Sequence, residues 1–199
     1  MISTLLHKPF HYHVVKDVFN DNQLKDIWEE LEFYQNNDKF FDPQTTGGAH
    51  DDDGELLKQN KALFIEGESK IHQYTNEQIL QPSIVNHPSS WFFSGVNWND
   101  ETTMVSYYDH NDYYEPHNDI SMLTACIWLY KEPKEFDGGV FSFPSYGMRF
   151  KCYNNCAVVF PSNIFHSVSK VIIKDQEKRN KGLGRYTITQ FASVNLQWN

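Results

Sequence analysis

The order of apolar and polar positions divides the chain into a first part with helical periodicity and a second part with short, strand-like runs. Phe10–Phe19 is rich in β-branched and aromatic residues and predicts a strand. Asn20 or Asp21 supplies a helix cap, and apolar residues at helical spacing predict a helix that ends at Asn36-Asn37. Residues 67–82 predict a second helix, which proline-containing turns follow.

The second part, from Trp91 onward, alternates short apolar and aromatic runs with turn residues. Many short strands at this spacing predict an antiparallel sandwich or barrel. The predicted strands are Thr102–Tyr108, Ser121–Tyr130, Val140–Phe143, Cys156–Phe160, Ser167–Ile173 and Arg185–Val194. We therefore expect a single domain over residues 1–199, mainly β with supporting helices. Residues 1–90 would supply an N-terminal strand and the helices, and residues 91–199 the β-core.

Two polar stretches separate these elements. Residues 36–55 are rich in Asp and Gly, and a loop of this length predicts a lid over a substrate groove. Lys174–Lys181 is a basic stretch that predicts an exposed hairpin extension. Its excess of Lys is more typical of a solvated loop than of a surface for an acidic partner.

Composition narrows the class of protein. Of the 199 residues, 40% are apolar and 16% aromatic, which excludes a disordered chain because so much apolar surface can form a core. The net charge of −9 disfavours nucleic-acid binding, since an acidic chain repels a phosphate backbone. Without a long apolar run or a signal-peptide pattern, we expect a cytoplasmic protein with no membrane partner. Cys126, Cys152 and Cys156 are then expected to be reduced structural thiols.

Nine histidines raise the question of a metal site. A lone His in a strand-rich domain is more often structural or exposed than a ligand. Histidines without a carboxylate at short spacing on a rigid element are set aside for that reason; these are His7, His11, His13, His72 and His87.

Three His-x-Asp triplets remain, and their contexts differ. His50 lies in the polar loop and His110 in a turn-forming cluster, whereas His117 leads into the longest predicted strand. Because side chains two apart on a strand share a face, His117 and Asp119 can present two ligands together. His166 follows a strand and a turn and is the best-placed third ligand. Two imidazoles and one carboxylate form the facial triad that binds iron(II) in non-haem oxygenases.

The last predicted strand adds a possible anion site. It begins with Arg185, and strand alternation places Thr187 and Thr189 on the same face. An Arg that faces a core needs an anion, and a guanidinium binds a carboxylate through two parallel hydrogen bonds. The alternative is a surface Arg at a strand end, but a dicarboxylate beside the metal would make the core-facing position chemically sensible.

The order of motifs points to a known family. Gly138-Gly139-Val-Phe-Ser-Phe143 and Arg185-Tyr-Thr-Ile-Thr189 follow an upstream motif Tyr-x-x-Gly-x-x-Tyr-x-x-His-x-Asp, in which Asn111 replaces the Gly. The residues at its other defined positions are Tyr108, Tyr114, His117 and Asp119. Over about residues 91–195 the chain therefore resembles the 2-oxoglutarate- and iron(II)-dependent dioxygenases, specifically their prolyl-4-hydroxylase-like branch.

The resemblance implies a double-stranded β-helix (jelly-roll) core with helices against its outer sheet. It also implies that iron(II) is held by His117, Asp119 and His166 and that Arg185 pairs with the 5-carboxylate of 2-oxoglutarate. The charges of iron(II), Asp119, 2-oxoglutarate and Arg185 then cancel, as an enclosed site requires. Further contacts of the co-substrate are implied for Tyr108, Trp128 and Thr189. O2 is the other co-substrate, and ascorbate is an auxiliary reductant in this family.

The implied reaction is the hydroxylation of an aliphatic carbon, with release of succinate and CO2. The substrate is a prolyl or other residue of a peptide or protein, and a small molecule stays an alternative. Asp119 fills the position that halogenating relatives leave open for chloride, and the demethylase pattern Arg-x-Asn-x-Thr is absent, so no nucleic-acid substrate is expected. Two rival interpretations remain, namely a cupin-like module that binds a metal or sugar without turnover and a structural jelly roll with incidental histidines.

Overall fold

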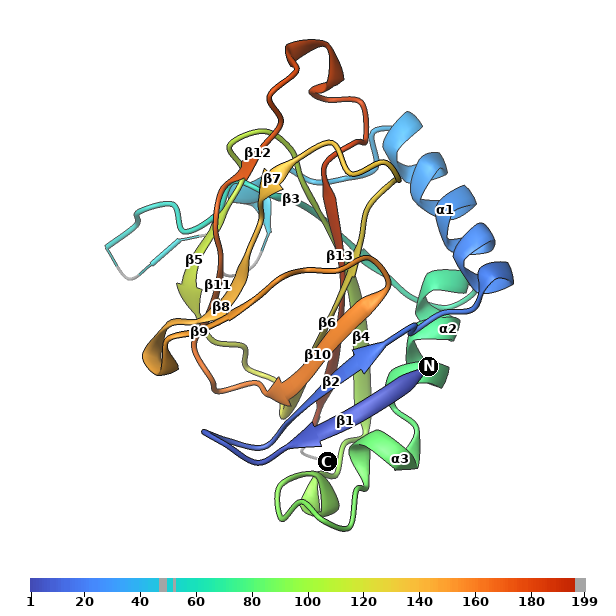
Figure 1. Ribbon diagram of the computed structural model, residues 1–199, viewed down its shortest axis with the longest axis vertical. Coiled ribbons are helices and arrows are strands. Elements are labelled where there is room, and N and C mark those ends of the chain that lie inside the picture. Colours follow the sequence, from blue (N-terminus) through green and yellow to red (C-terminus); the bar gives the residue numbers. More distant parts are fainter. Residues whose placement is uncertain (47–49, 52, 196–199) are drawn as a thin grey trace.

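The computed structural model describes residues 1–46, 50–51 and 53–195, and its main body consists of two antiparallel β-sheets (Figure 1). The larger sheet has seven strands in the order β1-β2-β10-β6-β13-β4-β3. These strands span Ile2–Leu6 (β1), Tyr12–Lys16 (β2), Cys156–Pro161 (β10), Leu123–Leu129 (β6), Arg185–Ser193 (β13), Asp100–Tyr108 (β4) and Lys61–Ile65 (β3).

The smaller sheet has four strands in the order β5-β11-β8-β9 and lies to the left of the larger one in Figure 1. Its strands span Tyr114–His117 (β5), His166–Val168 (β11), Phe141–Phe143 (β8) and Met148–Phe150 (β9). A short two-stranded pair, β7 (Asp137–Gly138) with β12 (Val171–Ile172), stands beside it.

Helices cover one face of the larger sheet, on the right in Figure 1. The helix α1 (Asp21–Asn36) begins with a reciprocal cap, because the Asn20 side chain accepts from the Gln23 backbone and the Gln23 side chain accepts from the Asn20 backbone. The helix α2 (Lys70–Ile79) begins at the Ser69 cap, and Pro82 starts a separate short helix, α3 (Pro82–Val85). The predicted second helix therefore divides near its end, since Pro is favoured at the first position of a helix.

The larger sheet separates two apolar clusters. Its helix-covered face carries Val105, Ile127 and Ile188, which pack with helix residues such as Ile27 and Leu31. Its other face carries Trp128 and Val158, which pack with Phe141 and Phe143 of the smaller sheet. The alternation of side chains along each strand produces this separation. The chain is thus mainly β with supporting helices and has the predicted double-stranded β-helix (jelly-roll) core.

Strands that the sequence pattern does not reveal complete both sheets. β1 and β3 form the two edges of the seven-stranded sheet, and both come from the first 65 residues. The predicted strand Ser167–Ile173 is divided between β11 and β12. None of the helices in the described part of the chain is long and apolar enough to cross a membrane.

The two polar stretches differ from their predictions in detail. The expected hairpin at Lys174–Lys181 is wrong, because β12 and β13 flank it and pair with different strands, and it contains only a 3-10 turn at Gln176–Lys178. It is a loop, and one of its backbone groups, Asn180 N–H, donates to the Asp109 carboxylate at 2.9 Å (Oδ2). Within 36–55, Phe41 pairs with Ala62 and Pro43–Thr45 forms a 3-10 turn, while residues 47–49 and 52 lie outside the described residues.

Candidate active site

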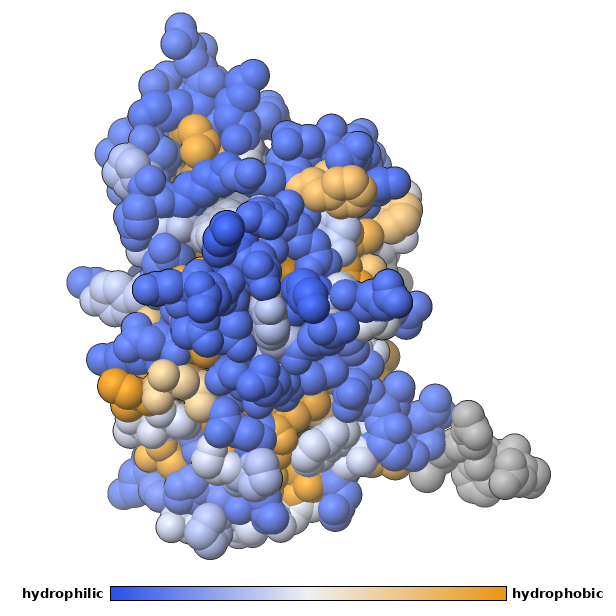
Figure 2. Space-filling model, turned by 90° about the vertical axis from the view of Figure 1, so that its right-hand side faces the viewer, coloured by the Kyte–Doolittle hydropathy of each residue, from blue (hydrophilic) through white to orange (hydrophobic). Residues whose placement is uncertain are grey.

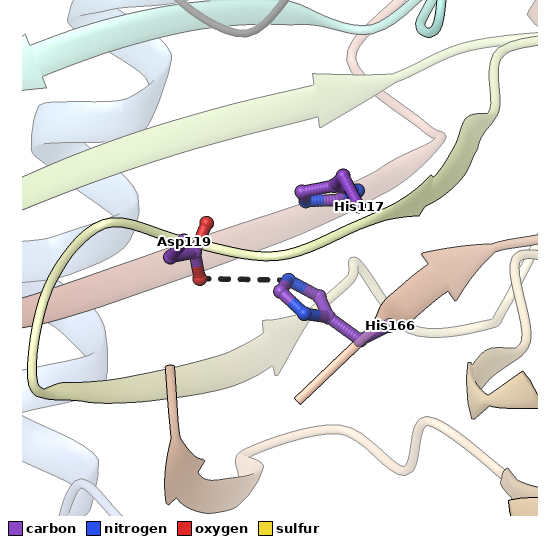
Figure 3. Close-up of side chains that lie close together, drawn as sticks. All are labelled: His117, Asp119 and His166. Atoms are coloured by element: carbon purple, nitrogen blue, oxygen red, sulfur yellow. Dashed lines mark ion pairs between the residues drawn. The ribbon is translucent and has the colours of Figure 1, made fainter. Parts of the chain in front are cut away.

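Three side chains from two segments meet in a cavity between the two sheets. His117 is the last residue of β5 and His166 is the first residue of β11, and the two are direct partners across these strands. Asp119 lies two residues beyond β5, and its Oδ2 is 3.5 Å from His166 Nε2 (Figure 3). One ligand atom from each of the three residues lies within 4.8 Å of the other two. This spacing can hold one metal ion.

Backbone carbonyls set the tautomer of both imidazoles. His117 Nδ1 is 2.8 Å from the carbonyl oxygen of Glu115, and His166 Nδ1 is 3.0 Å from that of Ile164. A carbonyl oxygen can only accept a hydrogen bond, so each Nδ1 carries the proton. Each Nε2 then keeps its lone pair for a metal ion, as ligating histidines require.

Burial keeps both rings neutral as well. Desolvation, with a smaller contribution from His166, lowers the pKa of His117 to about 3. Desolvation also lowers the pKa of His166, although the Asp119 carboxylate opposes it. A neutral imidazole and an ionised carboxylate are the protonation states in which these groups bind a divalent cation.

Hydrogen bonds orient the Asp119 carboxylate. Thr124 Oγ1 donates to Asp119 Oδ2 at 2.7 Å, and the Asp119 N–H donates to the Ser162 carbonyl at 2.9 Å. The predicted geometry of the His-x-Asp triplet is wrong in one respect, because His117 and Asp119 do not share a strand. The chain leaves the smaller sheet after His117 and enters the larger sheet at Leu123, so both side chains reach the cavity at a crossing between sheets.

Arg185 lies in the same cavity and is fully buried, with an exposed fraction of 0%. Its Nη2 contacts Cys152 Sγ at 3.7 Å, and its guanidinium lies 5.0 Å from the centroid of the Tyr108 ring. Its Nε and Nη1 have no hydrogen-bond partner among the described residues, and no carboxylate there forms an ion pair with it. A buried cation in this state is costly, so the geometry calls for an anion in the cavity.

The other predicted co-substrate residues differ in their access to this cavity. Its volume is about 620 Å³, and both Tyr108 and Thr189 line it. Trp128 faces the same side of the sheet opposite Thr187, but its ring packs against Phe141 and is not part of the cavity wall. The structure therefore brings Tyr108 and Thr189 into the cavity that Arg185 lines and leaves Trp128 behind its wall.

Two glycines and one asparagine of the family-like motifs adopt backbone conformations with positive φ, and one of them, Gly139, packs against Arg185. A Cβ on Gly139 would lie 3.0 Å from Arg185 Cδ, and a Cβ on Gly138 would lie 2.0 Å from the Lys170 carbonyl oxygen. Both have positive φ, which glycine adopts without strain. Asn111 has φ of 72°, so the residue that replaces Gly in the upstream motif adopts the left-handed conformation, which Asn tolerates better than most residues.

Sequence reasoning gave no role to two residues beside the histidines. The Tyr114 ring stacks on His117 with ring centroids 3.5 Å apart. Lys58 lines the cavity although it is only 1% exposed, and its segment pairs with β5 opposite Tyr114. Burial lowers the pKa of Lys58 to about 8, against the attraction of Asp119. Lys58 could not be found from the sequence, because it lies just beyond the polar stretch 36–55 and belongs to no motif.

Most of the other histidines and cysteines that the structure describes lie outside the metal-binding cluster, as the sequence predicts. His13 is buried and hydrogen-bonded to Ser3, and His72 is hydrogen-bonded to Thr103, whereas His50 lies at the rim of the cavity. All three cysteines are free thiols, and Cys126 lines the cavity. Within the described residues, His117, Asp119 and His166 are the group of side chains that could hold a metal ion.

Comparison with solved structures places this arrangement in a known fold. A prolyl-4-hydroxylase from Pseudomonas putida superposes with a TM-score of 0.65 at 16% identity over 93% of both chains. This chain has the fold of the 2-oxoglutarate- and iron(II)-dependent oxygenases. A Trichoplax adhaerens prolyl hydroxylase in complex with a hypoxia-inducible-factor peptide gives a TM-score of 0.66 at 14% identity, over 92% of this chain and 83% of that chain.

A viral collagen prolyl hydroxylase from Paramecium bursaria Chlorella virus 1, in complex with 2-oxoglutarate, gives a TM-score of 0.54 at 13% identity, over 92% of this chain and 96% of that chain. No family model matches the sequence, and no curated protein matches it. The likeness is therefore one of fold, and it agrees with the oxygenase fold that the motifs predict.

Proposed function

We propose that this protein is an iron(II)- and 2-oxoglutarate-dependent oxygenase that hydroxylates an aliphatic carbon. The observation that carries the proposal is Arg185, a fully buried guanidinium. It has no anionic partner among the described residues and shares one cavity with the His117, Asp119 and His166 cluster. A module that only binds a metal or a sugar has no need of a buried cation at this position. A dicarboxylate co-substrate would satisfy the guanidinium and reach the metal position together.

The donor set fits iron(II). Two neutral imidazole nitrogens and one carboxylate oxygen can occupy one face of the ion and leave three positions open. In this role His117, Asp119 and His166 hold the metal, while Arg185 binds the far carboxylate of 2-oxoglutarate through its unpartnered Nε and Nη1. When bound there, iron(II) and 2-oxoglutarate would enable O2 to hydroxylate a C–H bond of the substrate, with succinate and CO2 as the other products.

The chain's own residues orient these groups and keep water out. The Glu115 and Ile164 carbonyls hold the two imidazoles in the metal-binding tautomer, and Thr124 fixes the carboxylate. The Tyr108 ring lies under the guanidinium, and the Thr189 hydroxyl lies farther along the same face of β13. Together these contacts preorganise the site, so that little energy is spent on reorganisation during the reaction.

A residue of a peptide or protein, such as a prolyl residue, is the substrate we favour. The rim of the cavity carries three exposed apolar side chains, Phe64, Ile120 and Phe165, which would contact an extended polypeptide. His50 and Asp51, from the polar stretch predicted to be a lid, lie at the same rim. Residues 36–55 would then close over a bound substrate, and protease cleavage within them should slow when iron, 2-oxoglutarate and substrate are present.

Anaerobic titration of the protein with iron(II) and 2-oxoglutarate tests the proposal. Chelation of the metal by the keto acid should produce a weak visible charge-transfer band, and admission of air should then produce succinate. His166→Ala should abolish the band and lower succinate formation by roughly 1,000-fold or more, since removal of a metal ligand costs several kcal/mol.

His72→Ala is the matched control, because this histidine lies on α2 and hydrogen-bonds to Thr103 outside the cavity. It should leave both signals unchanged. A protein that binds iron(II) but shows neither the band nor succinate would be a cupin-like binding module, and a protein that binds no metal would be a structural jelly roll. Either result would overturn the proposed function.

A further inference from the structure

A second groove lies outside the active-site cavity, between β3 and α1, and has a volume of about 780 Å³. Leu63, Phe64 and Ile65 of β3 form one wall, and residues of α1 such as Phe33 form the other. Phe33 and Phe64 are 55% and 54% exposed, so the groove offers apolar surface to a partner. Figure 2, which views the helix-bearing side of the molecule, shows that such hydrophobic patches are small and isolated on a mostly hydrophilic surface.

β3 is an edge strand, and its outer edge is only partly covered. The Phe41 backbone exchanges two hydrogen bonds with Ala62, of 2.8 and 3.1 Å, which identifies the even-numbered residues as those that face outward. Phe64 therefore presents its backbone N–H and C=O to the same edge, where neither group has a backbone hydrogen bond to the Phe41 segment among the described residues. Exposed edges of this kind accept an added strand from another polypeptide.

The groove is acidic. Five carboxylates and two lysines line it. Glu30 is used within the fold, because it accepts from the Lys70 and Ile71 backbone at the start of α2, and Asp26 accepts from Tyr74. Glu66 and Glu68 are exposed side chains at the end of β3 and give the groove its negative charge. A second copy of this chain, with its net charge of −9, would be repelled, whereas a basic segment would be attracted.

The groove and the active-site cavity meet at Phe64, which lines both. Phe64 pairs with Met104 on the cavity side of the sheet, while Leu63 and Ile65 pack toward the helices. A strand added at this edge would point alternate side chains to the acidic groove and to the cavity mouth, because successive side chains of a strand face opposite ways. One bound segment could thus contact both surfaces.

We propose that this groove docks a lysine- or arginine-rich, extended segment of the substrate protein, which adds as a strand to the edge of β3 at Phe64. That the partner is a substrate rests on the proposed function. The docking itself depends on the edge, the acidic side chains and the continuity with the cavity. It selects basic polypeptides and positions them across the active-site mouth.

Fluorescence anisotropy with a labelled octapeptide of alternating Lys and Val tests the docking on the full chain, without iron, 2-oxoglutarate or turnover. The double variant Glu66→Lys/Glu68→Lys should weaken binding by about tenfold or more, since it reverses two charges that face the peptide. The matched control Glu132→Lys/Glu177→Lys makes the same change at exposed positions outside the groove and should change affinity by less than about twofold. Alternate backbone nitrogens of a strand point to opposite edges. N-methylation of the nitrogens on one edge of the peptide should abolish binding, and N-methylation of those on the other edge should not.

Several results would overturn the docking proposal. One is that the two double variants bind the Lys and Val peptide with equal affinity. Another is that a peptide of alternating Glu and Val binds as well as the Lys and Val peptide. A third is that N-methylation of either edge of the peptide leaves its affinity unchanged. If Glu66→Lys/Glu68→Lys changes the self-association of the protein but not its affinity for the peptide, the groove would bind a second copy of this chain instead. Because the assay needs no turnover, a failed docking leaves the succinate test of the oxygenase unaffected, and a failed succinate test leaves the docking result standing.

Discussion

The two faces of the seven-stranded sheet differ most along β13, although the same strand supplies both. Along β13, Tyr186 and Ile188 lie in the apolar cluster under the helices, whereas Arg185, Thr187 and Thr189 face the cavity. Both sides of the sheet have buried polar atoms without partners among the described residues, such as His13 Nε2 and Thr75 Oγ1 on the helix side and Thr187 Oγ1 on the cavity side. Within the described residues, the charged group among them is the Arg185 guanidinium, on the cavity face.

This difference separates the side chains that stabilise the fold from those that are available to bind a ligand in the cavity. Apolar side chains under the helices stabilise the folded chain in proportion to the surface they bury. A buried polar atom without a partner costs about 1–3 kcal/mol, and an unpaired charge costs more. Substitutions on the helix-covered face should therefore reduce stability, and substitutions on the cavity face should reduce ligand binding while stability is kept or raised.

The largest expected effect on the cavity face is that of Arg185→Met. Removal of the cation should weaken 2-oxoglutarate binding by about 2–5 kcal/mol, the usual cost of truncating one partner of a buried hydrogen-bonded charge pair. Thermal unfolding of the ligand-free protein should occur at the same or a higher temperature, because the variant no longer buries the guanidinium charge. Succinate formation against 2-oxoglutarate concentration measures the first effect, and calorimetry the second.

Arg149→Met is the control for Arg185→Met, since Arg149 is exposed on β9 and lies outside the cavity. It should alter neither the co-substrate requirement nor the unfolding temperature. An unchanged KM for 2-oxoglutarate in Arg185→Met would remove the assigned role of this residue. A marked fall in its unfolding temperature would instead make Arg185 part of the structural core and break the comparison between the faces.

On the helix-covered face, Ile188→Ala should lower the free energy of unfolding by about 2–5 kcal/mol. Ile188 is completely buried and its truncation leaves a cavity under the helices that the neighbouring side chains cannot fill. Urea denaturation measures the loss. The 2-oxoglutarate dependence of the remaining folded enzyme should stay unchanged, and a shift in it would mean that the two faces are coupled through β13.

The strand pattern explains how much of this arrangement could be predicted. Alternation along Arg185–Val194 correctly separates the cavity-facing from the helix-facing side chains, because the period of two holds throughout β13. The order of motifs led to the jelly roll and to the candidate residues His117, Asp119 and His166. Local propensity was sufficient wherever an element is long or carries a clear cap, as α1 does.

The parts that were missed depend on pairing across the chain. β3 (Lys61–Ile65) directly follows a polar stretch and contains a Lys, so it has no clear alternation, and only its pairing with β4 makes it a strand. β5 (Tyr114–His117) is short and contains Pro116, which is tolerated because the strand lies at an edge. Lys58 reaches the cavity through the pairing of its segment with β5, which no local pattern encodes.

His13 is a titratable residue on the apolar face and allows a test by pH. Desolvation, with a smaller effect of His87, lowers its pKa to about 4 in the fold, below the unfolded value of about 6.5. The unfolded chain therefore binds the proton more readily than the folded chain. The contribution of His13 to the free energy of unfolding is complete above pH 6.5 and is lost as the pH falls toward 4. The expected loss is about 2 kcal/mol between pH 7 and pH 5. His13→Gln should reduce this slope in urea denaturation, and an unaltered slope would contradict the assignment.

The smallest expected effect compares the same substitution at two positions of one face. The Thr187 hydroxyl is buried without a partner among the described residues, whereas Thr189 lies directly across from Cys126 of β6, with its hydroxyl beside the Cys126 thiol. Thr187→Val should leave the free energy of unfolding unchanged or raise it by up to about 1 kcal/mol, because an unsatisfied polar group is removed. Thr189→Val should lower it by about 0.5–1.5 kcal/mol, the net value of a hydrogen bond.

If the Thr187 hydroxyl serves the bound co-substrate, Thr187→Val should also weaken 2-oxoglutarate binding by a few-fold, consistent with one lost hydrogen bond of about 1 kcal/mol. Urea denaturation of the ligand-free protein and titration with 2-oxoglutarate separate the two effects. Equal loss of stability in both variants would mean that Thr187 has an internal partner after all. The unpartnered atoms of the cavity face would then reflect local packing, and Arg185 alone would distinguish this face from the one under the helices.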